Sequence, residues 1–211
     1  MTNKIGLTLI LALFSFGVVF SFKPSPELFS EMGPFELAQA LLMVASLIIW
    51  WRLAIVRKRE TSRDDNIHYT IAIFFAVLSF VVVGRETSFL KVYGAGENLE
   101  LGLMLLTTVI AVSILGVLSL QWFRTPRNTW RIFRAFISTP NFFWAISSFV
   151  FILMGDFFEK EWLPIQFNIV WEETFELMGY FAIVVAALVS ERSIVPHEVY
   201  EQEIAINKAL S

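Results

Sequence analysis

Six long apolar stretches constrain this chain more than any other feature of its sequence. A helix that crosses the hydrocarbon core of a bilayer needs about 20 mostly apolar residues, because each residue adds about 1.5 Å along a core about 30 Å thick. Six segments approach this length, and only short connections separate them: Ile5–Phe22, Pro34–Ala54, Tyr69–Leu90, Leu99–Trp122, Asn141–Phe158 and Phe167–Ser190. The sequence therefore predicts an all-α fold, a polytopic membrane bundle of six transmembrane helices.

The amino-acid composition favours the same class of protein. Hydrophobic residues make up 56% of the 211 residues and charged residues 17%, whereas a soluble domain has about 45–50% apolar and about 25% charged residues. There is no cysteine, which excludes disulfides, thiolate metal sites and cysteine nucleophiles. The first apolar run is longer than the core of a signal peptide, and no small-residue cleavage site follows it. We interpret this run as a retained first helix.

Lysine and arginine residues predict the orientation of the bundle, because they concentrate in cytoplasmic loops. With the N-terminus in the cytoplasm, twelve of the 16 fall on the cytoplasmic side: Lys4, Arg52, Arg57, Lys58, Arg59, Arg63, Arg124, Arg127, Arg131, Arg134, Arg192 and Lys208. The other four are Lys23, Arg85, Lys91 and Lys160. We therefore expect both termini to be cytoplasmic, with residues 1–190 forming the transmembrane domain and residues 191–211 a short cytoplasmic tail.

The connection RTPRNTWRIFRAFISTP mixes basic and apolar side chains. Its apolar residues Trp130, Ile132, Phe133 and Phe136 are interleaved with Arg127, Arg131 and Arg134. This pattern is typical of a short helix that lies at the membrane surface. A connection this short between two spans leaves little room for nucleic acid, so we expect no nucleic-acid partner.

The stretch VVVGRETSFL raises the main question about function. The apolar run before it, Ile71–Gly84, is too short to cross a bilayer alone. Either the helix is short, or it continues through Arg85 and Glu86 to Leu90 and places two charges in the outer part of the bilayer. A lone guanidinium in a span costs at least about 2.5–3.5 kcal/mol. Facing carboxylates with bidentate geometry would offset much of this cost.

Carboxylates recur at a similar depth on four of the predicted spans. The second span opens with one, the third and fifth end their apolar runs with one, and the sixth opens with three. These positions predict an ion-binding or polar cluster just beneath the outer headgroups, made of Glu36, Arg85, Glu86, Asp156, Glu172, Glu173 and Glu176. Four or five acids around one arginine leave excess negative charge, which must be protonated, hydrated or neutralised by a bound cation.

Helical phase suggests which side chains face the bundle. At about 100° per residue, one narrow stripe of the sixth span holds Glu172, Glu176, Gly179, Ile183 and Ala186. On the second span a weakly polar face holds Glu36, Gln39, Met43 and Ser46. The same phase turns Glu86 away from Arg85, so we expect the partners of Arg85 on other helices: Glu36, Asp156, Glu173 and Glu176.

A simpler interpretation explains some of these acids by the helix dipole alone. A carboxylate in the first turn of a helix is stabilised by the dipole, which accounts for Glu36, Glu172 and Glu173. It does not account for Glu86 and Asp156, which end their helices, where the dipole disfavours acids. Because of these two residues, we favour a packed polar cluster.

The segments GPFELAQALLMVASLI, VVVGRETSFLKVYG and WEETFELMGYFAIVVAAL resemble a group of small bacterial multi-pass membrane proteins. Members of this group share an Arg-Glu or Glu-Glu pair that ends one span and an acid cluster that opens a later one, and no activity is attached to them. The resemblance implies a location in the bacterial inner (cytoplasmic) membrane. It picks out Glu36, Arg85, Glu86, Glu173 and Glu176.

Three functions follow as hypotheses. The first is transport or conduction of protons or cations, because acids inside spans commonly mark ion paths. The second is a non-catalytic subunit, scaffold or sensor that acts with a protein partner or as a homo-oligomer in the lipid bilayer. The third, less favoured, is a carboxylate-metal enzyme, because Glu173-x-x-Glu176 resembles half of a di-iron helix but lacks the histidine that such motifs use. The sequence leaves the metal and any cofactor open.

Overall fold

The structure of the protein, a computed structural model, describes residues 2–22, 33–60, 67–87, 94, 96–124, 130, 134, 136, 137, 139–160 and 167–192. The described residues form six long helices: α1 (Thr2–Phe22), α2 (Pro34–Glu60), α3 (Ile67–Glu86), α4 (Glu97–Arg124), α6 (Pro140–Glu159) and α7 (Asn168–Arg192). All six are long and apolar enough to cross a membrane. The prediction of an all-α bundle of six helices is confirmed. The predicted tail lies outside the described residues beyond residue 192.

The third helix resolves the problem posed by its short apolar run. It begins at Ile67 and ends at Glu86, so its 20 residues rise about 30 Å, which is the thickness of the hydrocarbon core. Thr87 closes the last turn, because its backbone N–H lies 3.1 Å and its hydroxyl 2.8 Å from the Val83 carbonyl oxygen. Arg85 and Glu86 therefore occupy the final turn. Residues 88–90 of the predicted span lie outside the described residues.

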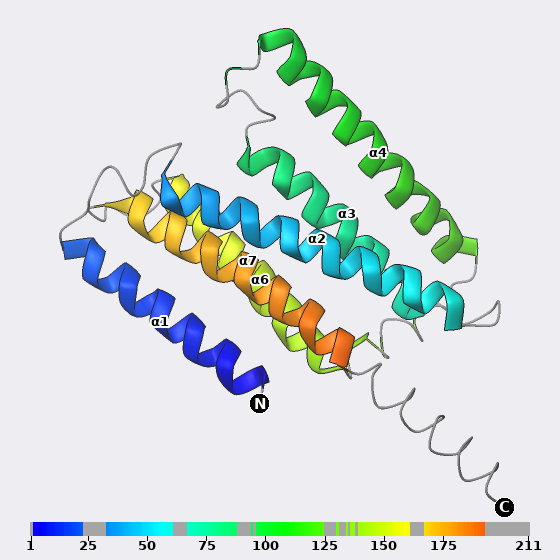
Figure 1. Cartoon of the computed structure of the whole chain (residues 1–211), viewed down its shortest axis with the longest axis horizontal. Helices are drawn as coiled ribbons and strands as arrows, with labels where there is room; N and C mark the ends of the chain where they lie inside the picture. The colour runs from blue at the N-terminus through cyan, green and yellow to red at the C-terminus, as the bar shows by residue number, and fades with distance from the viewer. Residues whose placement is uncertain are drawn as a thin grey trace, which may run out of the picture.

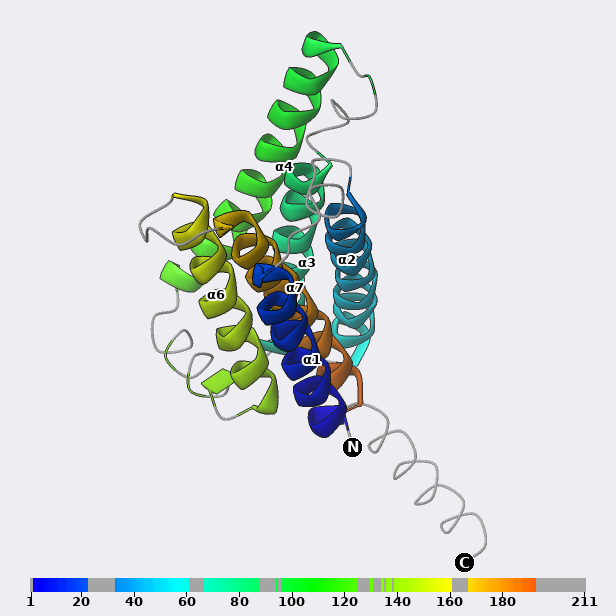
Figure 2. The same ribbon diagram turned by 90° about the vertical axis from the view of Figure 1, so that its left-hand side faces the viewer.

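The helices are arranged around α7. It packs against α6, α2 and α1, while α3 packs on α2 and α4 packs mainly on α3. Figure 1 shows α1 and α4 at opposite edges of the bundle. The start of α1 and the end of α7 lie at the same end of the molecule (Figure 2). We call this the basic end, and we call the opposite end, where α3 finishes and α7 begins, the acidic end.

Small residues allow α7 to occupy the centre. Ala182, Ala186 and Ala187 are fully buried. A Cβ added to Gly179 would lie 2.7 Å from the Ile152 side chain and 3.1 Å from a backbone oxygen of α6, so the two backbones touch at this glycine. Helices in lipid associate through such close van der Waals contact. The residues of the stripe predicted on α7 are buried, apart from the half-buried Glu172, and burial extends beyond the stripe to most of the helix.

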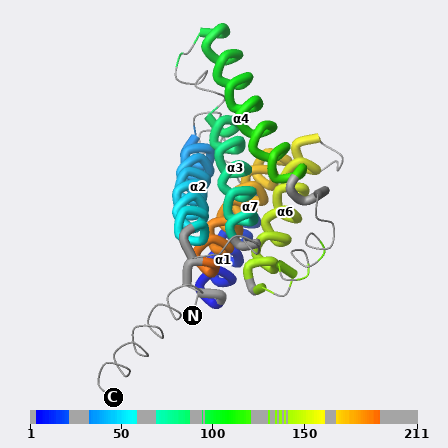
Figure 3. Tube along the Cα trace, turned by 90° about the vertical axis from the view of Figure 1, so that its right-hand side faces the viewer, coloured from blue at the N-terminus to red at the C-terminus, as the bar shows by residue number. Residues whose placement is uncertain are grey.

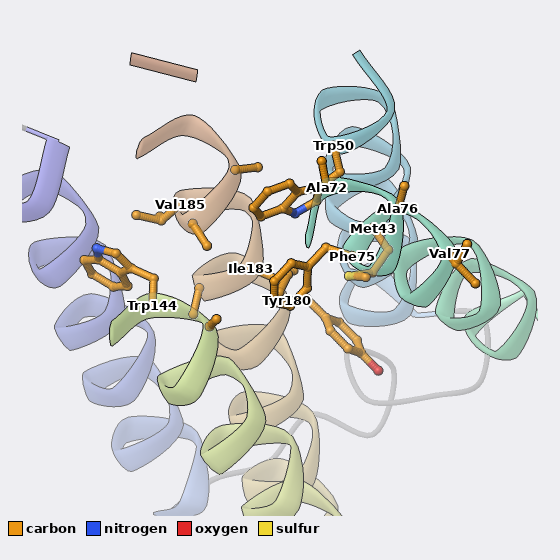
Figure 4. Packing of buried hydrophobic residues seen from close by; sticks show 14 of the residues in the cluster. Met43, Trp50, Ala72, Phe75, Ala76, Val77, Trp144, Tyr180, Ile183 and Val185 are labelled. Carbon is orange, nitrogen blue, oxygen red and sulfur yellow. The ribbon is translucent and has the colours of Figure 1, made fainter. Parts of the chain in front are cut away.

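An aromatic core fills the space between α2, α3 and α7. Trp50 stacks on Phe75 with 4.9 Å between ring centroids. Figure 4 shows Trp50, Phe75 and Tyr180 gathered between these helices, whereas Trp144 and Val185 lie on the side of α1. The side chains of this core come from segments far apart in the sequence and fix the order of the helices.

The basic connection before α6 is described only in part. Trp130, Arg134, Phe136 and Ile137 are helical, and the Arg134 guanidinium lies 5.2 Å from the centre of the Trp130 ring. Phe136 is partly buried, with its ring centroid 6.2 Å from that of Phe75. The other residues of the predicted surface helix lie outside the described part of the chain.

The outer faces of the bundle are apolar. On α4, Val109 is 61% exposed and Val112 is 64% exposed, and exposed leucines, valines and phenylalanines also cover α1 and α6. Soluble monomers rarely expose continuous apolar patches of this kind. Together with the length of the helices, this surface fits a multi-pass integral membrane protein. The side of the membrane on which each end lies stays a prediction from the lysines and arginines.

Candidate functional site

The candidate site lies at the acidic end, where three helices meet. Arg85 and Glu86 occupy the last turn of α3, while Glu173 and Glu176 lie in the early turns of α7. Because α3 runs toward this end and α7 runs away from it, the end of one helix lies beside the start of the other. The first turns of α2, which carry Glu36 and Gln39, complete the site. We call this group, with Glu172 and Tyr180, the Arg85 cluster.

The strongest contact in the Arg85 cluster joins α3 to α7. Arg85 Nη2 donates to Glu176 Oε1 at 2.6 Å, a distance typical of a charge-assisted hydrogen bond. Arg85 Nε also lies 3.8 Å from Glu86 Oε1. The two carboxylates are buried, with side chains 6% exposed, whereas the Arg85 side chain is 48% exposed. The guanidinium therefore covers the two carboxylates, while about half of the Arg85 side chain stays exposed.

A second bond from α7 holds the other carboxylate. The hydroxyl of Tyr180 donates to Glu86 Oε1 at 2.8 Å, and Tyr180 is only 1% exposed. Tyr180 follows Glu176 by one helical turn, so both side chains point toward α3. The α3–α7 contact thus contains two parallel polar links, Arg85 to Glu176 and Tyr180 to Glu86.

The amide of Gln39 links α2 to α7 inside the cluster. Its Nε2 donates to Glu173 Oε2 at 2.7 Å and lies 3.3 Å from the Glu173 carbonyl oxygen. Gln39 is 1% exposed, and its Oε1 has no hydrogen-bond partner within the described part of the chain. A buried amide oxygen without a donor is costly. This oxygen is therefore an acceptor available beside Glu173.

A glycine on α6 makes room for the buried acid. A Cβ on Gly155 would lie 2.7 Å from Glu176 Cγ and 3.3 Å from the Glu172 carbonyl oxygen. No side chain larger than hydrogen therefore fits at Gly155 without moving Glu176. The absence of a side chain at this position is what lets Glu176 lie flat between α6 and α7 while it reaches Arg85.

The remaining predicted site residues lie around the Arg85–Glu176 contact. Glu36 and Glu172 are half-buried, and Glu36 is close enough to interact electrostatically with Glu86 and Glu173. Asp156 lies at the edge of the site, where its carboxylate is 3.9 Å from Lys160 on its own helix. It also lies close enough to Glu172 and Glu176 to interact with them electrostatically.

Two expectations about contacts were incomplete. Glu86 was expected to point away from Arg85, yet the flexible arginine side chain bends back to it. The polar residues Gln39 and Tyr180 were not predicted to bond the acids. The available signal was their spacing, since Gln39 follows Glu36 by three residues and Tyr180 follows Glu176 by four, which places each on the same helix face as an acid.

The electrostatics of the Arg85 cluster are unbalanced. One guanidinium faces the carboxyl groups of Glu86, Glu172, Glu173 and Glu176, all of which interact electrostatically with one another or with Arg85. Within the described residues, no three acidic, histidine or cysteine side chains are arranged to hold a metal ion. The cluster therefore holds more carboxyl groups than guanidinium groups, and the neutral donors Tyr180 and Gln39 bind two of them, Glu86 and Glu173.

Comparison of the chain with protein-family models, with curated proteins and with solved structures gives no match.

Proposed function

We propose that this multi-pass membrane protein takes up protons or small cations at its acidic end and moves them across the membrane. The observation that supports this most is the excess of buried carboxyl groups over the single guanidinium of Arg85. We also propose that the acidic end faces outward and the basic end faces the cytoplasm of a bacterium, following the distribution of lysine and arginine.

The chemistry of the Arg85 cluster suits reversible uptake of positive charge. Carboxylic acids inside spans are costly, and they commonly mark ion paths or proton relays. Clefts lined by negative charge also concentrate cations from solution. Arg85 neutralises part of the charge and holds Glu176 in place, while Glu172 and Glu173 have no salt-bridge partner among the described residues.

Buried polar groups continue from the cluster toward the basic end. Below Gln39 on the same face of α2, the hydroxyl of Ser46 lies 2.8 Å from that of Ser79, and both residues are fully buried. Further on, a cavity of about 20 Å³ is lined by Trp50 and Asn141, among others. This volume is enough for a single water molecule. Single hydroxyls and single waters suit the passage of protons better than that of hydrated metal ions, so the proton is the favoured species.

A flux assay tests this proposal. The purified chain is reconstituted in vesicles with a trapped pH-sensitive dye, and a potassium gradient with valinomycin supplies the driving voltage. We expect proton entry that a Glu173→Gln variant largely abolishes. The matched control is Glu97→Gln, an exposed acid in the first turn of α4, which should leave the flux unchanged. If the wild-type protein moves no protons, Na⁺, K⁺ or divalent cations, the proposal is wrong.

A second candidate function is that of a non-catalytic membrane subunit, scaffold or sensor. It is favoured by the hydrogen bonds of the Arg85 cluster, which join α2, α3 and α7. Bonds of this kind hold helices together in proteins that transport nothing. This candidate predicts that every variant of the cluster loses assembly before any activity is measured. It also predicts that affinity purification recovers a stable partner. Folded variants that lose only proton flux would exclude it.

A further inference from the structure

The contact between Gln39 and Glu173 differs from the rest of the Arg85 cluster because it contains no positive charge. It lies where α2 packs against the central helix α7, whereas α4 stands at the outer edge of the bundle (Figure 3). Both residues are buried, and Gln39 Nε2 donates to Glu173 Oε2 at 2.7 Å. Among the described residues, no basic side chain forms an ion pair with Glu173.

The charges around Glu173 disfavour a second negative charge there. Its electrostatic neighbours on α2 and α7 are all acids: Glu36, Glu172 and Glu176. The described part of α1, which also packs on α7, carries Lys4 as its one charged residue, at the basic end. The other titratable groups of the acidic end that lie on α3, α6 and α7 interact with one another or with Glu172 and Glu176: Arg85, Glu86, Asp156, Glu159, Lys160 and Tyr180. A buried carboxyl group without a cation tends to neutralise by holding its proton.

Gln39 supplies the acceptor that a protonated Glu173 needs. Its Oε1 is buried without a hydrogen-bond partner in the described part of the chain, and Glu173 Oε1 takes no part in the bond from Nε2. An amide and a carboxylic acid are both planar and each offers one donor and one acceptor, so two parallel bonds join them. An ionised Glu173 would instead set two acceptors, its own Oε1 and that of Gln39, side by side without a donor.

We propose that Glu173 is a neutral carboxylic acid in the membrane and that its Oε1–H donates to Gln39 Oε1. Gln39 Nε2 keeps its bond to Glu173 Oε2, so the acid and the amide form a closed pair. The added proton makes the side chain neutral and satisfies the buried amide oxygen. As a step in transport, the pair rests on the proposed function: Glu173 is then the group that carries the proton, and Gln39 is its positioning residue.

Infrared spectroscopy tests this pair in the full-length chain. The protein is purified in a maltoside detergent, which has no ester carbonyl, and its spectrum is recorded at neutral pH. The Glu173 signal is the difference between the wild type and Glu173→Gln. We expect it to contain the C=O band of a protonated carboxylic acid and to lack carboxylate bands. Glu97→Gln, which changes an exposed acid of α4, should leave the acid band unchanged.

Variants at Gln39 test the partner of the proton. Gln39→Met has a similar volume but neither bonding atom, so the Glu173 band should persist and move to higher frequency. The reciprocal swap, Gln39→Glu with Glu173→Gln, again places an acid opposite an amide. It should restore the band that Glu173→Gln alone removes. Circular dichroism and gel filtration confirm that each variant folds.

Three results would overturn the proposal. Carboxylate bands in place of the acid band would show that Glu173 is ionised. An acid band that Gln39→Met does not move would show that the proton is donated to another group, such as water. A folded swap variant without the band would show that the pairing does not hold the proton. Since the spectra need no gradient, an acid band in a protein without proton flux would refute transport and leave the Glu173–Gln39 pair standing.

Discussion

The unequal burial of Arg85 and Glu176 leads to a quantitative prediction about stability. The Glu176 side chain is 6% exposed, whereas that of Arg85 is 48% exposed. Arg85→Met leaves a buried carboxyl group without its partner. Breaking a fully buried pair in this way costs about 3–5 kcal/mol, and an exposed pair is worth about 0–1 kcal/mol. The half-exposed geometry places the expected loss between these limits, at about 2–3 kcal/mol.

Glu176→Gln should be much milder. The amide keeps the shape of the carboxyl group and still accepts a hydrogen bond, and Arg85 already contacts solvent or headgroups with half of its surface. We expect a loss of about 1 kcal/mol, the value of one ordinary hydrogen bond. In the Glu176→Gln background the further change Arg85→Met should cost less than about 1 kcal/mol, because the carboxyl group of Glu176 is gone and Glu86 keeps its hydrogen bond from Tyr180.

The measurement is equilibrium unfolding in mixed micelles with an increasing fraction of dodecyl sulfate, followed by circular dichroism. Lys160→Met is the control, since it breaks an exposed pair with Asp156 and should cost less than about 0.5 kcal/mol. If Glu176→Gln destabilises the protein as much as Arg85→Met, burial does not govern this pair. If the double variant loses as much stability as the two single variants added together, the same conclusion follows.

Three further predictions concern other contacts. Gly179→Ala should lower the free energy of unfolding by about 1–3 kcal/mol in the same assay, because its Cβ would lie 3.1 Å from a backbone oxygen of α6. The control Gly116→Ala has open space around it and should cause no loss of stability. Tyr180→Phe removes the donor to Glu86 and should cost about 1–3 kcal/mol, and a neutral result would mean that the bond is not formed in the membrane. Ser46→Ala should cost about 0.6–1.7 kcal/mol and slow proton flux in vesicles, and normal flux would remove this serine from the path.

The number of helices and the approximate place of each could be predicted from the sequence because the bilayer acts on each helix separately, although α2 continues to Glu60, six residues beyond the predicted span. A span must reach across a fixed thickness, so the length of an apolar run indicates a helix, although α3 needed Arg85 and Glu86 to complete its length. The central place of α7 depends instead on contacts between helices. Gly179 and Ala186 are signals for such contacts, but similar small residues also occur on α4, where Gly116 meets nothing within 4 Å. Composition alone does not distinguish the two cases.

The depth of the site residues in the membrane could be predicted from the sequence, but the direction of their side chains around each helix axis could be predicted only in part. Arg85 and Glu176 are joined as expected, because both lie at the same depth and only a carboxyl group satisfies a guanidinium there. Asp156 also lies near the acids of the cluster, where it pairs with Lys160 and interacts electrostatically with Glu172 and Glu176. Gln39 was missed as a ligand because a neutral amide gives no charge signal. Direction around a helix axis is set by packing, which one sequence does not reveal.

The central position of α7 has a consequence for the synthesis and membrane insertion of the protein. This helix is the last of the six to be synthesised, yet it is the main partner of α1 and α6 and a major partner of α2. Nearly 150 residues separate the end of α1 at Phe22 from the start of α7 at Asn168, a delay of roughly 7–30 s at the usual pace of translation. During that interval α1 lacks the helix against which it mainly packs, so lipid must cover the face that α7 later buries.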